Sequence, residues 1–249
     1  MFNFFVQEDS RHGNSFIISG GDFNHIKNVL RMKEGDTFLV SCEGHSHLCE
    51  LTSLYGDSLV AEIVEENYNK TELPVKLYLF QGLPKGDKME LIIQKAVELG
   101  VEKIIPVEMD NCVVKLDDKK KKSKVARWPA RAESAAKQSK RNSIPAVGDV
   151  LTYKIAVELA KTLDIVLVPY ECAEGMAATK NALSQMQGGM SVGIFIGSEG
   201  GFSEKEIELA KDNGGKIISL GKRILRTETA AITALSMCML YAETELADD

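Results

Sequence analysis

Two different rhythms of apolar and polar residues divide the chain near residue 70. Before that point, short stretches alternate apolar with polar side chains, as in residues 15–18, 37–41 and 58–64, and turns containing glycine separate them. Alternation with a period of two is typical of strands that bury one face. One amphipathic helix is expected to interrupt these strands, over residues 23–32. The first part of the chain is therefore predicted to form a small β-barrel.

A second rhythm follows the polar residues 65–72, which we interpret as a linker. Apolar runs of strand length now alternate with segments of helical period. The predicted strands cover residues 75–80, 103–107, 164–168, 192–196 and 216–220, and the predicted helices cover residues 87–99, 179–186, 204–211 and 229–246. Such alternation is typical of a parallel sheet. We therefore expect a β-barrel domain over residues 1–71 and an α/β domain over residues 72–249.

Two of these helices are preceded by the residues of a capping box. In this motif the N-cap side chain and a Glu three residues later each accept a hydrogen bond from the other's backbone N–H. Asp87 with Glu90 fits the pattern before one helix, and Ser203 with Glu206 fits it before another. The motif predicts where both helices begin.

Composition indicates a globular protein of ordinary type. The 249 residues are 44% hydrophobic, enough for a sizeable core. No apolar run reaches membrane-spanning length, and the first residues lack the regions of a signal peptide. The five cysteines are odd in number and widely spread, which argues against a disulfide framework. We expect a cytoplasmic protein with no membrane partner.

Charge is distributed unevenly along the chain. The net charge is −6, yet residues 115–141 hold eleven Lys or Arg against three acidic residues, so this segment carries +8 and the remainder −14. A basic stretch on an acidic protein favours a polyanion bound at one face. The lysine run Lys119–Lys122, taken alone, is equally consistent with a solvated loop.

Four residues with metal-binding side chains lie close together in the predicted barrel: Cys42, His45, His47 and Cys49. They flank a predicted hairpin turn, where alternate side chains of a strand point to opposite faces. We therefore expect no metal site.

Two glycine-rich segments follow the last two strands predicted in the chain, at residues 197–203 (G-S-E-G-G-F-S) and 220–230 (L-G-K-R-I-L-R-T-E-T-A). Glycine lets the backbone approach a ligand, and open α/β sheets bind ligands at the carboxyl ends of their strands. Neither segment has a G-x-x-x-x-G-K-[ST] or G-x-G-x-x-G phosphate-binding pattern. Ile224 and Leu225, beside exposed backbone, suit a flat uncharged base such as adenine, although either could instead be a core residue.

The chain resembles the RsmE family of SPOUT-class methyltransferases over nearly its whole length. The residues that carry the resemblance are 25–31, 83–90, 96–100, Arg127, Trp128, 135–141, Pro145 and the two glycine-rich segments. The resemblance implies an N-terminal PUA-like RNA-binding β-barrel, a C-terminal α/β domain with a deep trefoil knot, and a homodimer. It also implies methyl transfer from S-adenosylmethionine to N3 of uridine 1498 in the 16S rRNA of the small ribosomal subunit.

This resemblance makes the two glycine-rich segments the walls of an S-adenosylmethionine pocket. The expected cofactor-binding residues are Leu79, Gly197, Ser198, Glu199, Gly200, Gly201, Leu220, Gly221, Ile224, Leu225, Arg226 and Thr227. Ser198 stands where the family usually has proline, which would leave the first turn less rigid.

Methylation at N3 requires removal of the imide proton of uracil. A base is therefore expected, or a group that stabilises the anion. Arg226 and Arg141 are the electrostatic candidates, because a guanidinium donates two parallel hydrogen bonds. Glu199 and Glu228 are the other candidates, although a Glu in the first turn of a helix can serve only to stabilise the helix dipole.

RNA is expected to bind through phosphate contacts that weaken steeply with salt. The candidate residues are His25, Lys27, Arg31, Lys85, Lys88, Lys137, Gln138, Lys140 and Arg141. Two alternative functions stay open on the sequence: another SPOUT RNA methyltransferase, acting on tRNA or on a ribose 2′-hydroxyl, and a non-catalytic ribosome-assembly factor.

Overall fold

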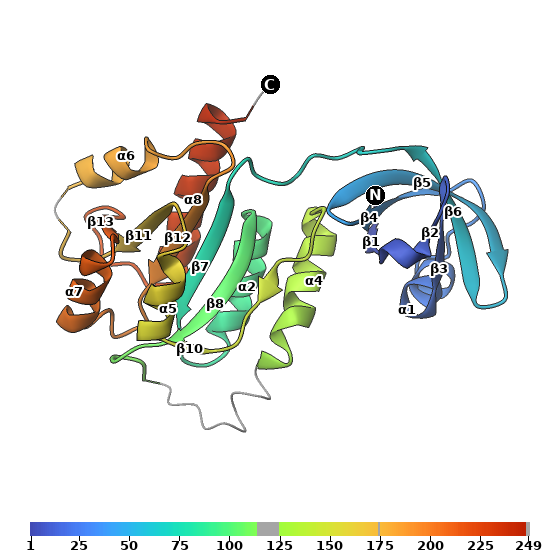
Figure 1. Ribbon diagram of the computed structural model, residues 1–249. Coiled ribbons are helices and arrows are strands. Elements are labelled where there is room, and N and C mark those ends of the chain that lie inside the picture. The colour runs from blue at the N-terminus through green and yellow to red at the C-terminus, as the bar shows by residue number, and fades with distance from the viewer. Residues whose placement is uncertain (114–124, 174, 248–249) are drawn as a thin grey trace. The chain divides into compact units, whose positions relative to one another are not determined.

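The computed structural model describes residues 1–113, 125–173 and 175–247 (Figure 1). By their contacts the residues form two compact units: Met1–Glu72 with Ala136–Ile144, and Leu73–Ala135 with Pro145–Asp249. The lysine run Lys119–Lys122 lies outside the described residues. No helix of the described residues is both long enough and apolar enough to cross a membrane.

The first unit contains a six-stranded sheet with the order β1-β4-β5-β6-β3-β2. Its strands are β1 (Asn3–Phe5), β2 (Arg11–His12), β3 (Ser15–Ser19), β4 (Thr37–Cys42), β5 (His45–Tyr55) and β6 (Ser58–Glu65). All neighbours pair antiparallel except β1 with β4. Alternate residues of β3 are buried, as the sequence predicts. They join a core that includes Phe4, Phe38 and Leu51.

The predicted helix over residues 23–32 is irregular in the structure. A short α1 (Gly20–Asn24) runs into a π-helical turn η2 (His25–Val29), in which Leu30 N–H donates to the carbonyl of His25 at 2.9 Å. A second short helix, the 3₁₀ turn η1 (Glu8–Ser10), precedes β2. A π-helical turn places side chains differently from an α-helix, and such turns occur frequently at functional sites.

The segment Ala136–Ile144 packs within the first unit although it lies far along the chain. The carbonyl of Arg141 accepts hydrogen bonds from Asn3 Nδ2 at 3.0 Å and from the Ser41 hydroxyl at 3.4 Å. The Arg141 guanidinium is bidentate on the Glu72 carboxylate, which also accepts from the backbone N–H of Asn142 at 2.8 Å. Arg141 is only 3% exposed. Its guanidinium therefore anchors this segment, rather than facing solvent.

The second unit contains a parallel seven-stranded sheet with the order β10-β8-β7-β12-β11-β13 and β9 beside β8 (Figure 1). The strands are β7 (Lys76–Gly82), β8 (Val101–Glu108), β9 (Ala146–Val147), β10 (Leu151–Thr152), β11 (Ile165–Pro169), β12 (Ser191–Ile196) and β13 (Lys216–Ile218). The helices are α2 (Lys88–Glu98), α4 (Trp128–Ser139), of which residues 136–139 belong to the first unit, α5 (Tyr153–Ala160), α6 (Ala177–Leu183), α7 (Glu204–Asp212) and α8 (Thr227–Glu245). The prediction of a parallel α/β unit is confirmed.

The centre of this sheet is packed by aromatic rings from its two middle strands. Phe80 on β7 and Phe195 on β12 are register partners, and their rings stack with centroids 4.4 Å apart. Tyr153 from α5 and Ile207 from α7 complete this core. The packing fixes β7 beside β12, so the segments that leave their carboxyl ends are held side by side.

One of the two predicted capping boxes forms. Ser203 Oγ accepts from the N–H of Glu206 at 3.3 Å, and Glu206 Oε2 accepts from the N–H of Ser203 at 2.8 Å. The prediction for Asp87 is wrong: its side chain makes no cap bond, and its φ of −101° and ψ of 11° differ from the extended conformation of a capping residue. Glu90 N–H instead donates to the backbone carbonyl of Asp87.

Candidate functional site

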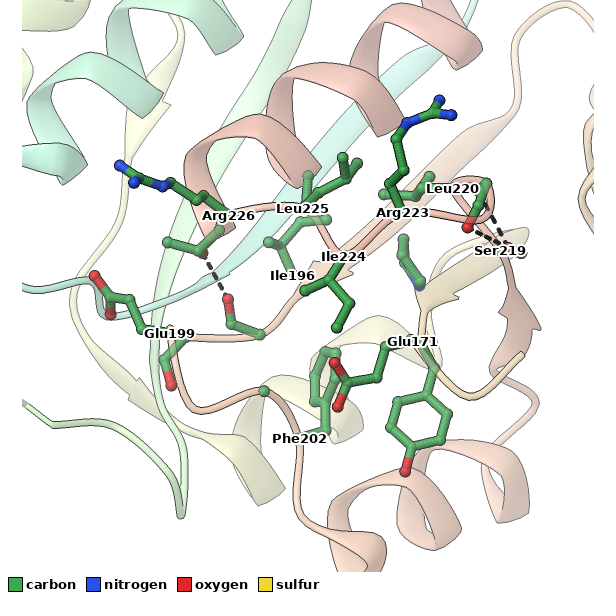
Figure 2. A pocket seen from close by; sticks show the side chains of 18 of the residues that line it. Glu171, Ile196, Glu199, Phe202, Ser219, Leu220, Arg223, Ile224, Leu225 and Arg226 are labelled. Carbon is green, nitrogen blue, oxygen red and sulfur yellow. Dashed lines mark hydrogen bonds between the residues drawn. The ribbon is translucent and has the colours of Figure 1, made fainter. Parts of the chain in front are cut away.

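A cavity of about 430 Å³ opens at the carboxyl edge of the second unit's sheet (Figure 2). Its walls come from residues 169–171 at the end of β11 and just after it, residues 196–199, 201 and 202 at the end of β12 and after it, and residues 219–227 after β13, with Lys88 of α2 and Ala230 of α8. Small-molecule sites typically measure roughly 300–1,000 Å³. The cavity is therefore large enough for a nucleoside-sized ligand.

Most of the residues expected to bind a cofactor line this cavity. They are Gly197, Ser198, Glu199, Gly201, Leu220, Gly221, Ile224, Leu225, Arg226 and Thr227. Leu79 and Gly200 are absent from the lining among the described residues. Leu79 is fully buried in the middle of β7, where it pairs in register with Ile194, so it belongs to the core.

The first turn is held by hydrogen bonds to the segment after β8. The Ser198 hydroxyl donates to the carbonyl of Asn111 at 3.0 Å, and Asn111 Nδ2 donates to the carbonyl of Gly200 at 3.1 Å. A Cβ at Gly200 would lie 2.6 Å from the Asn111 carbonyl oxygen, so this glycine serves close packing. Ser198 therefore anchors the turn through its hydroxyl, although it lacks the ring of a proline.

Thr227 ties the two glycine-rich segments together. Its hydroxyl donates to the carbonyl of Gly197 at 2.6 Å and accepts from Gln81 Nε2 at 2.9 Å. Gln81 is fully buried near the end of β7. Sequence reasoning missed Gln81, yet it carries a recognisable signal: a polar residue directly after the apolar strand run 75–80.

Apolar surface is exposed on the second turn. Gly221 has a φ of +111°, a conformation that favours glycine, and its N–H donates to Ser219 Oγ at 3.2 Å. Ile224 lines the cavity while remaining 85% exposed, and Leu225 beside it is half-buried. Figure 2 shows Ile224 projecting toward Glu171 and Phe202. Ile224 is therefore a wall of the cavity and not a core residue.

Three charged side chains form an ion-pair cluster beside the first turn. Lys88 Nζ lies 2.9 Å from Glu199 Oε1 and 3.4 Å from Glu228 Oε2. Lys85 N–H also donates to both Glu199 oxygens, at 3.0 and 3.3 Å. Burial alone would raise the pKa of Glu199, but the hydrogen bonds from Lys88 and backbone N–H groups outweigh it and lower the pKa. Glu199 is therefore ionised at neutral pH and suited to hold the turn.

The four candidate catalytic residues occupy three different settings. Arg226 is exposed and lines the cavity, as does Glu199. Glu228 is outside the described lining, and its Oε2 is buried without a hydrogen-bond partner among the described residues. Arg141 belongs to the first unit, where Glu72 holds its guanidinium.

Several residues of the cavity lining were not predicted, Tyr170 and Glu171 among them. Both residues follow β11. Glu171 is exposed and has no hydrogen bond or ion pair to any other part of the chain that the structure describes. It brings a negative charge to the cavity that a cationic ligand could neutralise.

The candidate RNA-binding residues also fall into several settings. In the first unit, those that are exposed are His25, Lys27, Arg31, Gln138 and Lys140. Lys137 lies 3.1 Å from Asp22 Oδ1, and Arg141 is buried. In the second unit, Lys88 lies in the ion-pair cluster and Lys85 supplies a backbone N–H to it.

The Cys and His residues of the first unit that were considered as possible metal ligands contact other groups. The Cys42 thiol donates a hydrogen bond to Glu8 Oε2, with a distance of 3.3 Å from Sγ to Oε2. Cys49 is fully buried in the core. Burial lowers the pKa of His47, and the charge of Arg11 lowers it further. No group of three or more potential metal ligands occurs within residues 1–113, 125–173 and 175–247.

Comparison with known proteins identifies the class of protein to which this chain belongs. Residues 71–239 match a family model described as an RNA methyltransferase domain, and residues 18–64 match an RNA methyltransferase PUA domain. The N-terminal PUA domain and C-terminal methyltransferase domain are thus those of an RNA methyltransferase.

Relatives narrow this class to a family. Ribosomal RNA small subunit methyltransferase E of Bacillus subtilis is 42% identical over 233 residues, covering 92% of this chain and 91% of that protein. The protein of that name from Mesomycoplasma hyopneumoniae is 37% identical over 239 residues, covering 96% and 99%. A crystal structure of the Neisseria gonorrhoeae enzyme bound to S-adenosyl methionine is 29% identical, covers 96% of this chain and 97% of that chain, and has a TM-score of 0.79. The chain belongs to the ribosomal RNA small subunit methyltransferase E (RsmE) family.

Proposed function

We propose that this protein methylates N3 of uridine 1498 in the 16S rRNA of the small ribosomal subunit, with S-adenosylmethionine as methyl donor. The observation that carries the proposal is the cavity between the two glycine-rich segments, in a chain 42% identical to an enzyme named for small-subunit rRNA methylation. The cytoplasm, where ribosomal subunits are built, is the proposed compartment.

The residues of the cavity fit S-adenosylmethionine. Ile224 and Leu225 offer an apolar wall beside exposed backbone, which suits adenine, and the free carboxylate of Glu171 suits a ligand with positive charge. The volume of about 430 Å³ fits a ligand of this size. When bound, this cofactor supplies an electrophilic methyl carbon on a sulfonium, whose bonding electrons stay with sulfur after transfer.

The protein's own part is to orient the uracil and to help N3 lose its proton. Arg226 lines the cavity and has an exposed side chain, whose guanidinium can donate to carbonyl oxygens of the base. Glu199 already accepts hydrogen bonds from Lys88 and Lys85, and its lowered pKa makes it a weak base. We therefore assign Glu199 to holding the first turn and Arg226 to stabilising the imide anion.

Two architectural expectations belong to the same proposal. A homodimer is supported by apolar side chains on the paired helices α2 and α8, where Leu91 is 42% exposed and Leu240 58% exposed. A solution mass of one chain by light scattering would argue against it. The trefoil knot stays a prediction.

Methylation of isolated small subunits tests the proposal. Subunits that lack the modification are incubated with the protein and radiolabelled S-adenosylmethionine, and the rRNA is digested for nucleoside mass spectrometry. We expect 3-methyluridine. A 2′-O-methylated nucleoside, or label in tRNA only, would instead favour the other RNA methyltransferases. Absence of calorimetric heat with S-adenosylmethionine would favour a non-catalytic assembly factor.

A further inference from the structure

Lys88 is placed to do more than join two glutamates. Its side chain begins α2, lines the cavity and is 32% exposed. Glu199 accepts one hydrogen bond from its ammonium, and Glu228 lies at ion-pair distance. An ammonium has three N–H donors, so at least one is left for a ligand.

Lys88 also shares one end of the cavity with Arg226. Figure 2 shows the side chains of Glu199 and Arg226 at the same end, and Lys88 Nζ lies 2.9 Å from Glu199. Two cationic donors, Lys88 at the start of α2 and Arg226 just before α8, therefore flank this end. The other cationic residues of the lining, Lys222 and Arg223, come from the second turn.

Uracil has a matching pattern of acceptors. Its O2 and O4 oxygens stand on either side of N3, and both take up negative charge when N3 loses its proton. A donor on each side would stabilise that anion more than neutral uracil, which is the requirement for catalysis. Cytosine carries an amino group in place of O4, so a cationic donor at that position would disfavour it.

We propose that Lys88 donates a hydrogen bond to a carbonyl oxygen of the target uracil and stabilises the charge that develops as N3 is deprotonated. This proposal rests on the proposed uridine N3 methylation. N3 releases its proton to solvent, keeps the electron pair of the N–H bond, and shares that pair with the incoming methyl carbon. Lys88 stays protonated throughout, and Glu199 fixes the position of its ammonium.

The ion-pair cluster explains how Lys88 can keep this role at neutral pH. The hydrogen bond to Glu199 raises the pKa of Lys88, and the charge of Glu228 acts in the same direction. The lysine therefore stays cationic in a partly buried position. Glu228 Oε2 is buried and has no hydrogen-bond partner in the part of the chain described, and the Lys88 ammonium lies 3.4 Å from it.

The test compares Lys88→Met with wild type on two substrates under single-turnover conditions. One substrate is the ordinary small subunit, and the other carries 5-fluorouracil, whose N3–H is more acidic. We expect Lys88→Met to slow methylation of the ordinary subunit about 100-fold, as for loss of one donor to an oxyanion. On the fluorinated substrate the deficit should shrink to less than about 10-fold, because less stabilisation is needed. Equal deficits on both substrates would overturn the proposal.

Controls separate this role from a structural one. Lys95→Met removes an ion pair with Glu98 on the same helix, away from the cavity, and should leave methylation unchanged. In Lys88→Met the Glu199 carboxylate loses its ion-pair partner, and the double variant Lys88→Met/Glu199→Gln removes that carboxylate as well. Recovery of activity in that double variant would assign the defect to Glu199 and overturn the proposal. Wild type that forms no 3-methyluridine would refute the proposed function itself, a result distinct from failure of the Lys88 variant.

Discussion

At the scale of single residues, some charged side chains of the cavity have an ion-pair partner and others have none in the part of the chain that the structure describes. Glu199 and Lys88 are paired with each other, whereas Arg226 and Glu171 have no ion pair among the described residues. Lys88 neutralises the charge of Glu199, so Glu199 can hold the first turn, while the Lys88 ammonium keeps an N–H donor for a ligand. The free groups are the ones left to respond to a ligand's charge. On this reasoning Arg226 is the strongest candidate for contact with a substrate that becomes anionic.

Replacement of Arg226 tests that reasoning. We expect Arg226→Ala to lower the single-turnover rate of methylation roughly 100-fold or more, the size typical for loss of a donor to developing negative charge. Its far-UV circular dichroism should match wild type, because Arg226 is exposed and its side chain makes no cap hydrogen bond to α8. Arg226→Lys keeps the charge, so its methylation rate should lie between those of wild type and Arg226→Ala. Normal methylation by Arg226→Ala would remove this residue from the mechanism.

At the scale of elements, the position of the cavity depends on the order of strands. Parallel pairing of β7 with β12, fixed by Phe80 and Phe195, holds Gln81 near Gly197. Thr227, at the start of α8, then bonds to both. Three segments that are distant in sequence are joined by one hydroxyl. The geometry of the two glycine-rich segments therefore depends on a side chain that supplies no ligand-binding charge.

Removal of this hydroxyl should affect stability and binding together. Thr227→Val is similar in shape but leaves the Gly197 carbonyl and the Gln81 amide without this partner. Loss of a partner for buried polar groups costs roughly 1–3 kcal/mol, so we expect a loss of that size in urea unfolding. Calorimetry should also show weaker binding of S-adenosylmethionine. Thr227→Ser keeps the hydroxyl and serves as control. Unchanged stability of the valine variant would contradict the role of this bond.

Many of the helices and strands could be predicted from the sequence, because buried parallel strands and amphipathic helices have strong periodic signals. The capping box of Ser203 and Glu206 is correct for the same local reason. The failures come from conformation and tertiary pairing. Asp87 has the residue type of a cap but not the backbone angles. The π-helical turn at His25–Val29 and the burial of Arg141 against Glu72 depend on partners that no local pattern reveals.

At the scale of the whole molecule, RNA binding depends on which basic residues are free. In the first unit, Lys27, Arg31 and Lys140 are exposed and have no ion pair among the described residues. Arg141 is held by Glu72, so it does not offer its charge to a phosphate. The net charge of −6 makes such local positive charge the main attraction for RNA.

Neutralising these three residues together should reduce the salt dependence of RNA binding. Each phosphate contact contributes about 0.7–0.9 to the slope of log affinity against log salt concentration, so loss of three should lower the slope by roughly two. The measurement is fluorescence anisotropy with a labelled rRNA fragment between low and moderate salt, comparing wild type with Lys27→Ala/Arg31→Ala/Lys140→Ala.

The matched control must remove the same charge elsewhere. Lys161, Lys205 and Lys211 are exposed residues of the second unit outside the cavity lining, and their triple alanine variant changes net charge equally. If only overall charge mattered, both variants would weaken binding alike and with similar slopes. A reduced slope confined to the first-unit variant would instead identify direct phosphate contacts. Equal slopes in wild type and that variant would mean that RNA is bound by other residues.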